Sequence, residues 1–202
     1  MMNESTMMDT VQVLWQRIES WLSRHAPHAW HLLREGASEG EIQQAEVALD
    51  ITLPADFRAS CRIHNGGYAL DLVTEMQILP LEEIVSLWQV LKDCLEQGSW
   101  DGLTPDHFLQ DRSREQGLPL QLVWWHPQWI PCGMDRTGNC CCLDLAPAPA
   151  GIVGQVIDWD HEVGPSRVLA SSFLELLTTF ANDLEAGEYV ETADGLTRRS
   201  QP

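Results

Sequence analysis

Apolar residues recur at helical spacing near the start of the chain, between residues 9 and 24. The positions that share this stripe are Val11, Leu14, Trp15, Ile18 and Leu22. A return every three or four residues places side chains on one face of a helix. The pattern therefore predicts an amphipathic helix over about residues 9–24, with Trp15 in the core.

Two further helices are indicated by their start signals. Ser38 and Glu41 have the spacing of a capping box, in which the serine caps the helix and the glutamate reaches back. Pro54 suits the first turn of the next helix, because its missing N–H has no partner there anyway. His64 and the glycines that follow it are expected to stop that helix.

The rest of the chain contains both strand-like and helix-like patterns of apolar residues. Residues 74–79 read as a strand, and a helix with apolar residues at Ile84, Leu87, Trp88, Leu91 and Leu95 follows and closes at Gly98. A last helix begins at a second capping box, Ser172 with Glu175, and ends near Gly187. Short strands are expected at 122–125, 129–132, 140–145 and 154–159.

Helices, then an antiparallel meander, then one helix indicate an α+β fold, with a mixed or mostly antiparallel sheet flanked by helices. We expect a single domain over residues 9–187, containing a loop or insertion at 98–124. Residues 1–8 are expected to be disordered, and residues 188–202 to form a frayed tail.

Charge changes the picture more than any other bulk property. The sequence has 30 acids and 12 bases, a net charge of −18, and a single lysine, Lys92. Such a balance disfavours nucleic acid and anionic membranes as partners. It favours a basic protein partner, because opposite fields accelerate encounter. Solubility alone is the competing explanation.

The rest of the composition indicates a protein of the reducing cytoplasm. The chain has no apolar run of about 18 residues, the length that spans a membrane, and its start has no signal-peptide pattern. Its six cysteines are then expected to be reduced thiols. A chain of this size can form its core unaided, so a monomer or weak dimer is expected.

Four cysteines are candidate metal ligands. Cys140 and Cys142 would share one face of a strand, with Cys132 across a hairpin and Cys141 on the opposite face. Structural zinc usually takes paired ligands of the C-x2-C type, which this run lacks. Small buried thiols are the alternative, and we expect no metal and no cofactor.

Catalytic chemistry has little support in the sequence. A cysteine nucleophile would need a base such as His64, His126 or His161, and no local signature of such a pair is present. Asp158, Asp160 and Glu162 cluster after a strand and could hold a hard cation, but no calcium-loop pattern surrounds them. The sequence predicts a protein that is not an enzyme.

The same three acids, with two tryptophans, form the predicted contact surface for a partner. Adjacent residues of a strand face opposite ways, so one of Trp124 and Trp125 should be in the core and the other partly exposed. An exposed tryptophan beside Asp158, Asp160 and Glu162 is typical of an interaction hot spot for an arginine-containing partner. Packing under the insertion is the alternative for both rings.

A family resemblance emerges from motifs that follow one another in a fixed order. They are WQRIESW (15–21), GASEGEIQQAE (36–46), LPADF (53–57), HNGG (64–67), WIPCG (129–133), GNCCCLDL (138–145), GQVIDW (154–159) and LASSFLELL (169–177). Together they resemble the SUKH superfamily, which contains fungal Smi/Knr-type cell-wall-assembly regulators and bacterial immunity proteins.

The resemblance implies an α+β fold and a non-enzymatic role. It implies most directly a cytoplasmic immunity protein that binds and neutralises a basic toxin domain. A regulatory interaction module of the cell-wall-assembly type, or a small-ligand-binding domain, is the alternative. The 98–124 insertion and the triple cysteine depart from a minimal member, and the insertion could carry partner specificity.

Overall fold

The computed structural model describes residues 3–73, 76–103, 119–192 and 195–199 of the chain. Its helices are α1 (Glu4–His25), α2 (Pro27–His31), α3 (Glu39–Leu49), α4 (Ala55–Ile63), α5 (Leu81–Glu96) and α7 (Phe173–Glu185). Its strands are β1 (Gly67–Val73), β2 (Met76–Ile78), β3 (Trp129–Met134), β4 (Cys140–Asp144), β5 (Gln155–Asp160), β6 (Gly164–Ala170), β7 (Tyr189–Thr192) and β8 (Gly195–Arg198).

The main sheet has six strands in the order of the sequence, from β1 to β6. Every neighbouring pair is antiparallel, and β7 with β8 forms a separate antiparallel hairpin. The sheet is therefore a meander, which needs only short connections between most strands. The α+β prediction with a mostly antiparallel sheet is confirmed.

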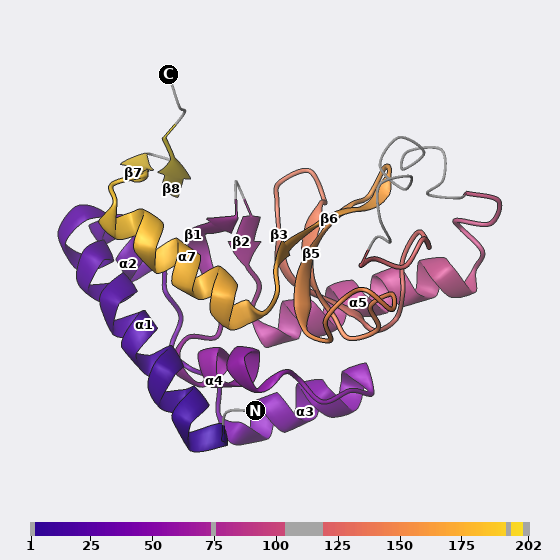
Figure 1. Ribbon diagram of the computed structural model, residues 1–202, viewed down its shortest axis with the longest axis horizontal. Helices are drawn as coiled ribbons and strands as arrows, with labels where there is room; N and C mark the ends of the chain where they lie inside the picture. Colours follow the sequence, from indigo (N-terminus) through magenta and orange to yellow (C-terminus); the bar gives the residue numbers. More distant parts are fainter. Residues whose placement is uncertain (1–2, 74–75, 104–118, 193–194, 200–202) are drawn as a thin grey trace.

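Helices cover the sheet from more than one side. α7 packs against β1, β5 and β6, while α5 runs along the lower edge of the sheet in Figure 1 and packs against β3. α1 packs against α4 and α7, and α3 lies beside α5. The central strand β4 is buried at all five positions, so both of its faces are covered.

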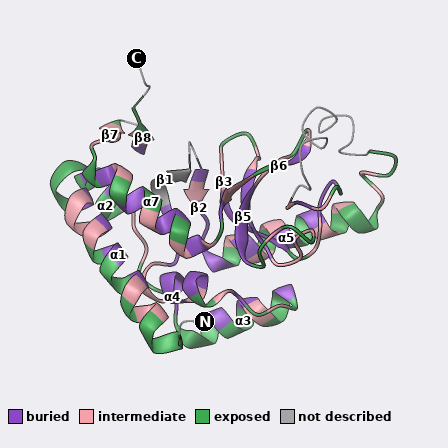
Figure 2. Ribbon diagram, in the orientation of Figure 1, coloured by how far each residue is buried: buried purple, intermediate pink, exposed green. Residues whose placement is uncertain are grey.

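The core joins the helical half of the chain to the sheet. Figure 2 shows buried positions along the inner faces of α1 and α7 and through the central strands. Trp15, Trp129 and Trp159 are among the largest side chains that are fully enclosed. Phe57 of α4 meets Phe173 of α7 edge to face, with ring centroids 4.9 Å apart. Such aromatic pairs add to the stabilisation that burial gives.

The predicted buried face of the first helix is confirmed, but the helix begins earlier than expected, so the prediction of disorder over residues 1–8 is wrong from Glu4 onward. All five residues of the predicted stripe are buried. Helix α1 starts at Glu4, rather than near Asp9, because the side chain of Asn3 accepts a hydrogen bond from the backbone N–H of Thr6 at 2.8 Å. That bond satisfies one of the free donors of the first turn.

One predicted capping box is complete and the other is altered. Ser38 accepts from the backbone N–H of Glu41, whose carboxylate accepts from the N–H of Ser38 at 2.7 Å. Ser172 likewise caps α7 through the N–H of Glu175. The carboxylate of Glu175, however, accepts from the N–H and hydroxyl of Ser171, one residue earlier than a capping box requires.

The strand predictions were partly wrong. Strands β2, β3, β4 and β5 match four of the expected segments, but residues 122–124 form bends and Trp125 is not in a strand. In that segment the carbonyl of Trp124 accepts from the indole N–H of Trp159 at 2.7 Å, and that of Pro119 accepts from the Gln155 amide. These backbone carbonyls thus accept from side chains of β5, rather than from the backbone of a neighbouring strand. Strands β1 and β6 were not predicted.

The expected fraying after residue 187 was also wrong over the described part of the tail. Residues 189–192 and 195–198 form the β7–β8 hairpin. Tyr189 is buried and its ring meets Phe180 edge to face at 5.2 Å, and Leu196 is buried as well. Tyr189 thus packs the hairpin on α7, while β8 lies against β1.

The motif WQRIESW is explained by contacts between α1 and the end of α4. The indole N–H of Trp15 donates to the hydroxyl of Ser60 at 2.9 Å. Glu19 and the carbonyl of Arg34 each lie 2.7 Å from a ring nitrogen of His64, which ends α4. Both ring nitrogens of His64 are thereby engaged in the structure.

The motifs LPADF and HNGG supply two buried junctions. Asp56 is buried and accepts from the backbone N–H of Leu174 at 2.8 Å, so a residue of α4 caps the start of α7. Asn65 is buried and accepts from the N–H of Leu81 at 2.9 Å at the start of α5. Gly66 has a φ of 81° and lies against Pro80, so a side chain there would be strained.

Candidate protein-interaction surface

The predicted acidic contact residues lie at the turn between β5 and β6. Asp158 is on β5, half-buried, and accepts hydrogen bonds from the Ser166 hydroxyl at 3.0 Å and from Arg167 at 3.2 Å. Arg167 therefore neutralises it locally. This acid is held by its own hairpin and is less available to a partner than its neighbours.

Asp160 and Glu162 follow at the turn itself. One carboxylate oxygen of Asp160 accepts from the backbone N–H groups of Glu162 and Val163, at 2.7 and 3.2 Å. The Glu162 side chain is 78% exposed, and His161 lies 3.9 Å from it. Glu162 is thus the most accessible of the three acids, while Asp160 also shapes the turn.

The expected exposed tryptophan is not found. Trp124 and Trp125 are both buried, with exposures of 8% and 2%. Because residues 122–125 are not a strand, the alternation that should have turned one ring outward does not apply. Trp125 packs near Trp100, which also contacts Trp159 edge to face at 6.4 Å. Both rings are therefore enclosed, and Trp125 packs on Trp100 from the described start of the 98–124 segment.

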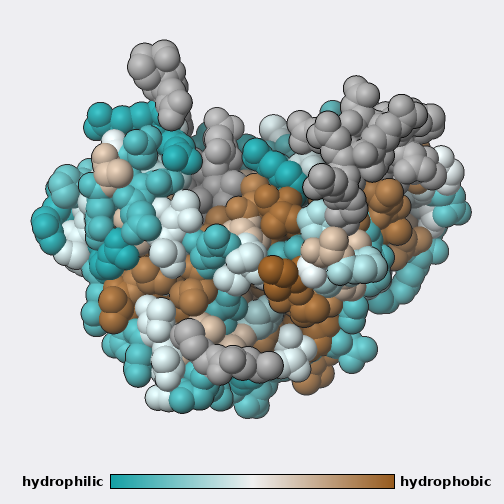
Figure 3. Space-filling view, viewed as in Figure 1, coloured by the Kyte–Doolittle hydropathy of each residue, from teal (hydrophilic) through white to brown (hydrophobic). Residues whose placement is uncertain are grey.

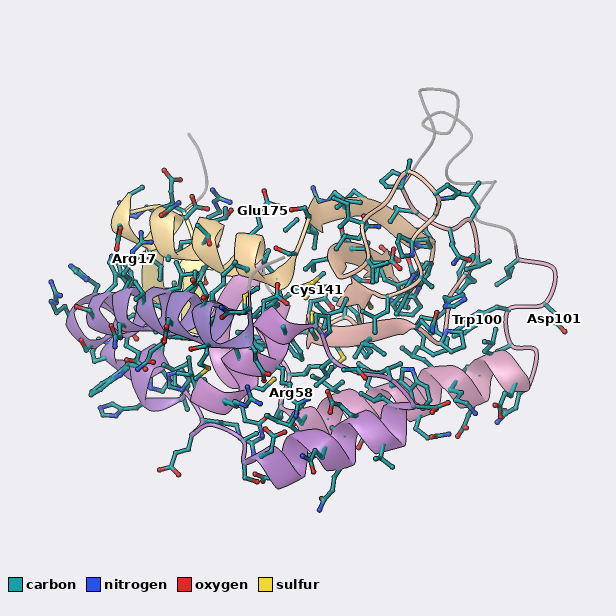
Figure 4. All side chains as sticks on the ribbon, turned by 60° about the horizontal axis from the view of Figure 1, so that its bottom comes forward. Arg17, Arg58, Trp100, Asp101, Cys141 and Glu175 are labelled. Carbon is teal, nitrogen blue, oxygen red and sulfur yellow. The ribbon has the colours of Figure 1, made fainter. Side chains whose placement is uncertain are left out.

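The 98–124 segment is described only at its two ends. Residues 104–118 lie outside the described residues. At the first end, Figure 4 shows Trp100 turned toward the sheet and Asp101 pointing away from the molecule. Asp101 is exposed and adds one negative charge at this side of the sheet.

The cysteines pair differently from the expected arrangement. Pro131 is in register with Cys142, so Cys132 falls beside Cys141 and not beside Cys140 or Cys142. The sulfur atoms of Cys132 and Cys141 are 3.7 Å apart, and both residues are buried. The hydrogen bond with the Cys141 thiol, together with burial, raises the pKa of Cys132, and burial raises that of Cys142, so both thiols are held in their neutral form.

Within 3–73, 76–103, 119–192 and 195–199 no cluster of three or more His, Cys, Asp or Glu could hold a metal ion. His126 caps its own turn by accepting from the Gln128 N–H at 3.1 Å, and burial lowers its pKa. His161 lies 2.9 Å from the side-chain oxygen of Asn139. Each histidine thus has a local structural partner.

One buried carboxylate was missed at the sequence level. Asp144 is fully buried and accepts from the Trp129 indole at 2.9 Å, from the Gln155 amide at 2.8 Å and from the Ala146 N–H at 3.0 Å. Burial raises its pKa, and these hydrogen bonds oppose that effect. The only available signal was an acid inside the otherwise apolar run CCCLDL. Its role is to join β3, β4 and β5.

Positive charge at the surface is largely used within the molecule. In the described part of the chain, the basic side chains that form ion pairs include Arg17, Arg34, Arg58, Arg62, Lys92, Arg167 and Arg198. The chain has 30 acids against 12 bases, so many acids are left without a cation. The field outside the molecule is consequently negative.

No helix in the described part of the chain is both long and apolar enough to cross a membrane.

Comparison with known proteins identifies relatives over most of the chain. It is 29% identical to the cell wall assembly regulator SMI1 of Saccharomyces cerevisiae, over 87% of this chain and 40% of that protein. It is 31% identical to the cell wall biosynthesis/cell cycle regulator smi1 of Schizosaccharomyces pombe, over 89% of this chain and 37% of that protein. A glucan synthesis regulatory protein of Neurospora crassa is 27% identical to it, over 89% of this chain and 39% of that protein. The chain thus spans about two fifths of the length of these relatives.

A family model agrees with these pairwise matches. The SMI1/KNR4 (SUKH-1) model matches residues 36–179, which run from the loop before α3 into α7 and include the whole main sheet. With the meander sheet and the motif junctions described above, this places the chain in the SMI1/KNR4 family (SUKH-1).

Proposed function

We propose that this chain is a non-catalytic regulatory module that acts by binding a protein partner. The observation that carries the proposal is its similarity, over nearly nine tenths of its length, to proteins named as regulators of cell wall assembly and glucan synthesis. These names favour the regulatory alternative over toxin neutralisation. The chain matches only part of those relatives, so partners of their other segments are not transferred to it.

The partner is proposed to be basic. The net charge is −18, and most of the described cations are already paired with acids of the same molecule. A negative field of this size accelerates encounter with a cationic protein and slows encounter with an acidic one. The proposed contact is the β5–β6 turn, where Glu162 is exposed and Asp160 is next to it.

A pair of charge-matched variants tests this contact. Glu162→Lys and Asp9→Lys change the net charge equally, but Asp9 is an exposed residue of α1, away from the β5–β6 turn. Each variant is used as bait in low-salt affinity capture, and bound proteins are quantified by mass spectrometry. Loss of a basic protein from the Glu162→Lys bait alone supports the proposal. Equal capture by both baits, or capture of acidic proteins only, contradicts it.

A further inference from the structure

A groove lies at the end of the molecule opposite the β5–β6 turn (Figure 1). It runs between the second half of α1, the end of α7 and strand β7. Two adjoining pockets of about 330 and 340 Å³ form it, and they share Trp21, His25 and Glu185. Their common lining makes them one continuous surface. Its size is in the range of a site for a few side chains of a bound peptide.

The floor of the groove is aromatic and apolar. The rings of Trp21 and His25 are stacked, with centroids 4.8 Å apart and planes 28° from parallel. Val13 lines one pocket and is 56% exposed, and Val190 lines the other and is 41% exposed. Figure 3 shows hydrophobic surface between α1 and α7 within hydrophilic surroundings. These side chains could bury an apolar anchor of a ligand.

The charge of the groove is opposite in sign to that of the whole molecule. Arg17, Arg24 and Arg199 line it, against Glu185 and Glu191. Three cations and two anions give a net of +1, on a chain whose net charge is −18. Two other pockets lined by described residues differ, since Glu46 and Asp50 line one, and the other has one arginine and two glutamates.

The two acids of the groove are already bound within the fold. Glu185 accepts two hydrogen bonds from Arg17, at 2.7 and 2.9 Å, and this pair bridges α1 and α7. Glu191 accepts from the backbone N–H of Ala29 at 2.9 Å, at the start of α2. Their charges are therefore largely compensated by groups of the same molecule.

The remaining two arginines are not compensated in this way. Arg24 donates to the neutral hydroxyl of Ser20. Neither Arg24 nor Arg199 forms an ion pair with a residue that the structure describes. Each guanidinium can still offer paired N–H donors to a carboxylate, which is the geometry in which arginine binds anions best.

We propose that this groove is a docking site for a short acidic segment of a partner protein that carries an aromatic or aliphatic anchor. The anchor packs on Trp21 and Val190, and carboxylates of the segment bind Arg24 and Arg199. A polyanion such as a nucleic acid is disfavoured, because the negative field of the whole chain opposes it while only two local cations attract it. The proposal is independent of the proposed function, since it concerns a different surface and a ligand of opposite charge.

The probe is a synthetic peptide in which Asp and Glu alternate with Leu around one Trp, labelled with fluorescein. Its binding to the whole chain is followed by fluorescence anisotropy. The Arg24→Glu/Arg199→Glu variant is compared with Arg136→Glu/Arg167→Glu, which changes the net charge equally at the other end of the molecule. Thermal melting verifies that both variants are folded.

The groove variant is expected to bind the peptide at least about tenfold more weakly than the wild type, since charge-assisted hydrogen bonds are lost. The affinity of the matched control for the peptide should stay within about threefold of that of the wild type, because only the long-range effect of its charge change acts on the peptide. Trp21→Ala should also weaken binding. Glu162→Lys, at the β5–β6 turn, should leave binding of the acidic peptide unchanged. The peptide experiment therefore tests the groove separately from the proposal of a basic partner.

Three outcomes would overturn the docking proposal. One is that the acidic peptide fails to bind at millimolar concentration. Another is that both double variants weaken it equally. The third is that a peptide with Lys in place of Asp and Glu, or a single-stranded oligonucleotide, binds at the same groove more tightly than the acidic peptide.

Discussion

Asp56 shows how a motif residue can serve the fold without serving chemistry. Its carboxylate is buried where α4 begins, and it accepts from the N–H of Phe57 at 2.9 Å and from the N–H of Leu174 at 2.8 Å. The second bond joins helices that are far apart in the sequence. Anions at a helix start are stabilised by the free N–H groups there.

Asp56→Ala is expected to lower the free energy of unfolding by about 1–3 kcal/mol, because a buried N–H of α7 loses its acceptor. Asp56→Asn should recover only part of this, since its amide offers a single acceptor oxygen. Asp93→Ala, at an exposed position of α5, is the control and should change stability by less than about 0.5 kcal/mol. Urea denaturation measures all three. An unchanged denaturation midpoint for Asp56→Ala would contradict the claim that the Asp56 carboxylate stabilises the contact between α4 and the start of α7.

Trp15 is the residue for which the sequence pattern was most informative. It is 1% exposed, and its indole donates to Ser60. Trp15→Ala should destabilise the protein by about 3–5 kcal/mol, the range for deleting a large buried aromatic. Trp30, which is 41% exposed, provides the control substitution. Comparable melting temperatures for the two alanine variants would contradict the core assignment.

Asp135 should give the chain a measurable pH dependence. Burial would raise its pKa, but hydrogen bonds from Asn139 and Thr137 outweigh burial and lower the pKa below the ordinary 3.8. The folded state then binds this proton less tightly than the unfolded state. Its contribution to stability is therefore present above pH 3.8 and is lost as the pH falls through the folded pKa.

The pKa of Asp135 can be read from a carboxyl NMR titration. A value below 3.8 is expected, and Asp135→Asn should reduce the loss of stability on acidification below that pH. A pKa at or above 3.8 would show that the hydrogen bonds of this turn do not favour the charged form.

At the scale of elements, helices were predictable and several strands were not. Helix α1 and the box at Ser38 were readable because their signals are local, in the spacing of apolar residues and in a single cap. The β7–β8 hairpin was missed because its docking depends on distant residues: Tyr189 packs on Phe180 of α7, and β8 lies against β1. Trp124 and Trp125 were misplaced for the same reason, since side chains from β5 fix their segment.

The capping box gives a test at this scale. Ser38→Ala removes the acceptor for the Glu41 N–H and should lower stability by about 1 kcal/mol. Ser23→Ala, at an exposed position inside α1, should have a smaller effect. If chemical denaturation gives equal losses for both variants, the cap contributes nothing beyond the local loss of a hydroxyl.

At the scale of the whole molecule, the negative charge and the family relationship point to binding, while contact residues could not be read from the sequence. Charge is a property of composition, so its sign was evident without a structure. Which acids are free was not evident, because Asp158 is paired with Arg167 and Asp160 holds a turn. The arginines of the α1–α7 groove come from distant segments and meet only in the fold.

The most direct test of the central claim is the salt dependence of association with the protein captured by the wild-type bait. Stopped-flow mixing measures the association rate at salt concentrations between about 0.05 and 0.5 M. Raising the salt over this range shortens the Debye length to a few ångströms. If the negative surface steers a basic partner, the association rate should fall at least about tenfold, while dissociation changes less. Glu162→Lys should flatten this dependence more than Asp9→Lys. An association rate that does not change with salt, or that falls equally in both variants, would contradict binding through the acidic β5–β6 turn.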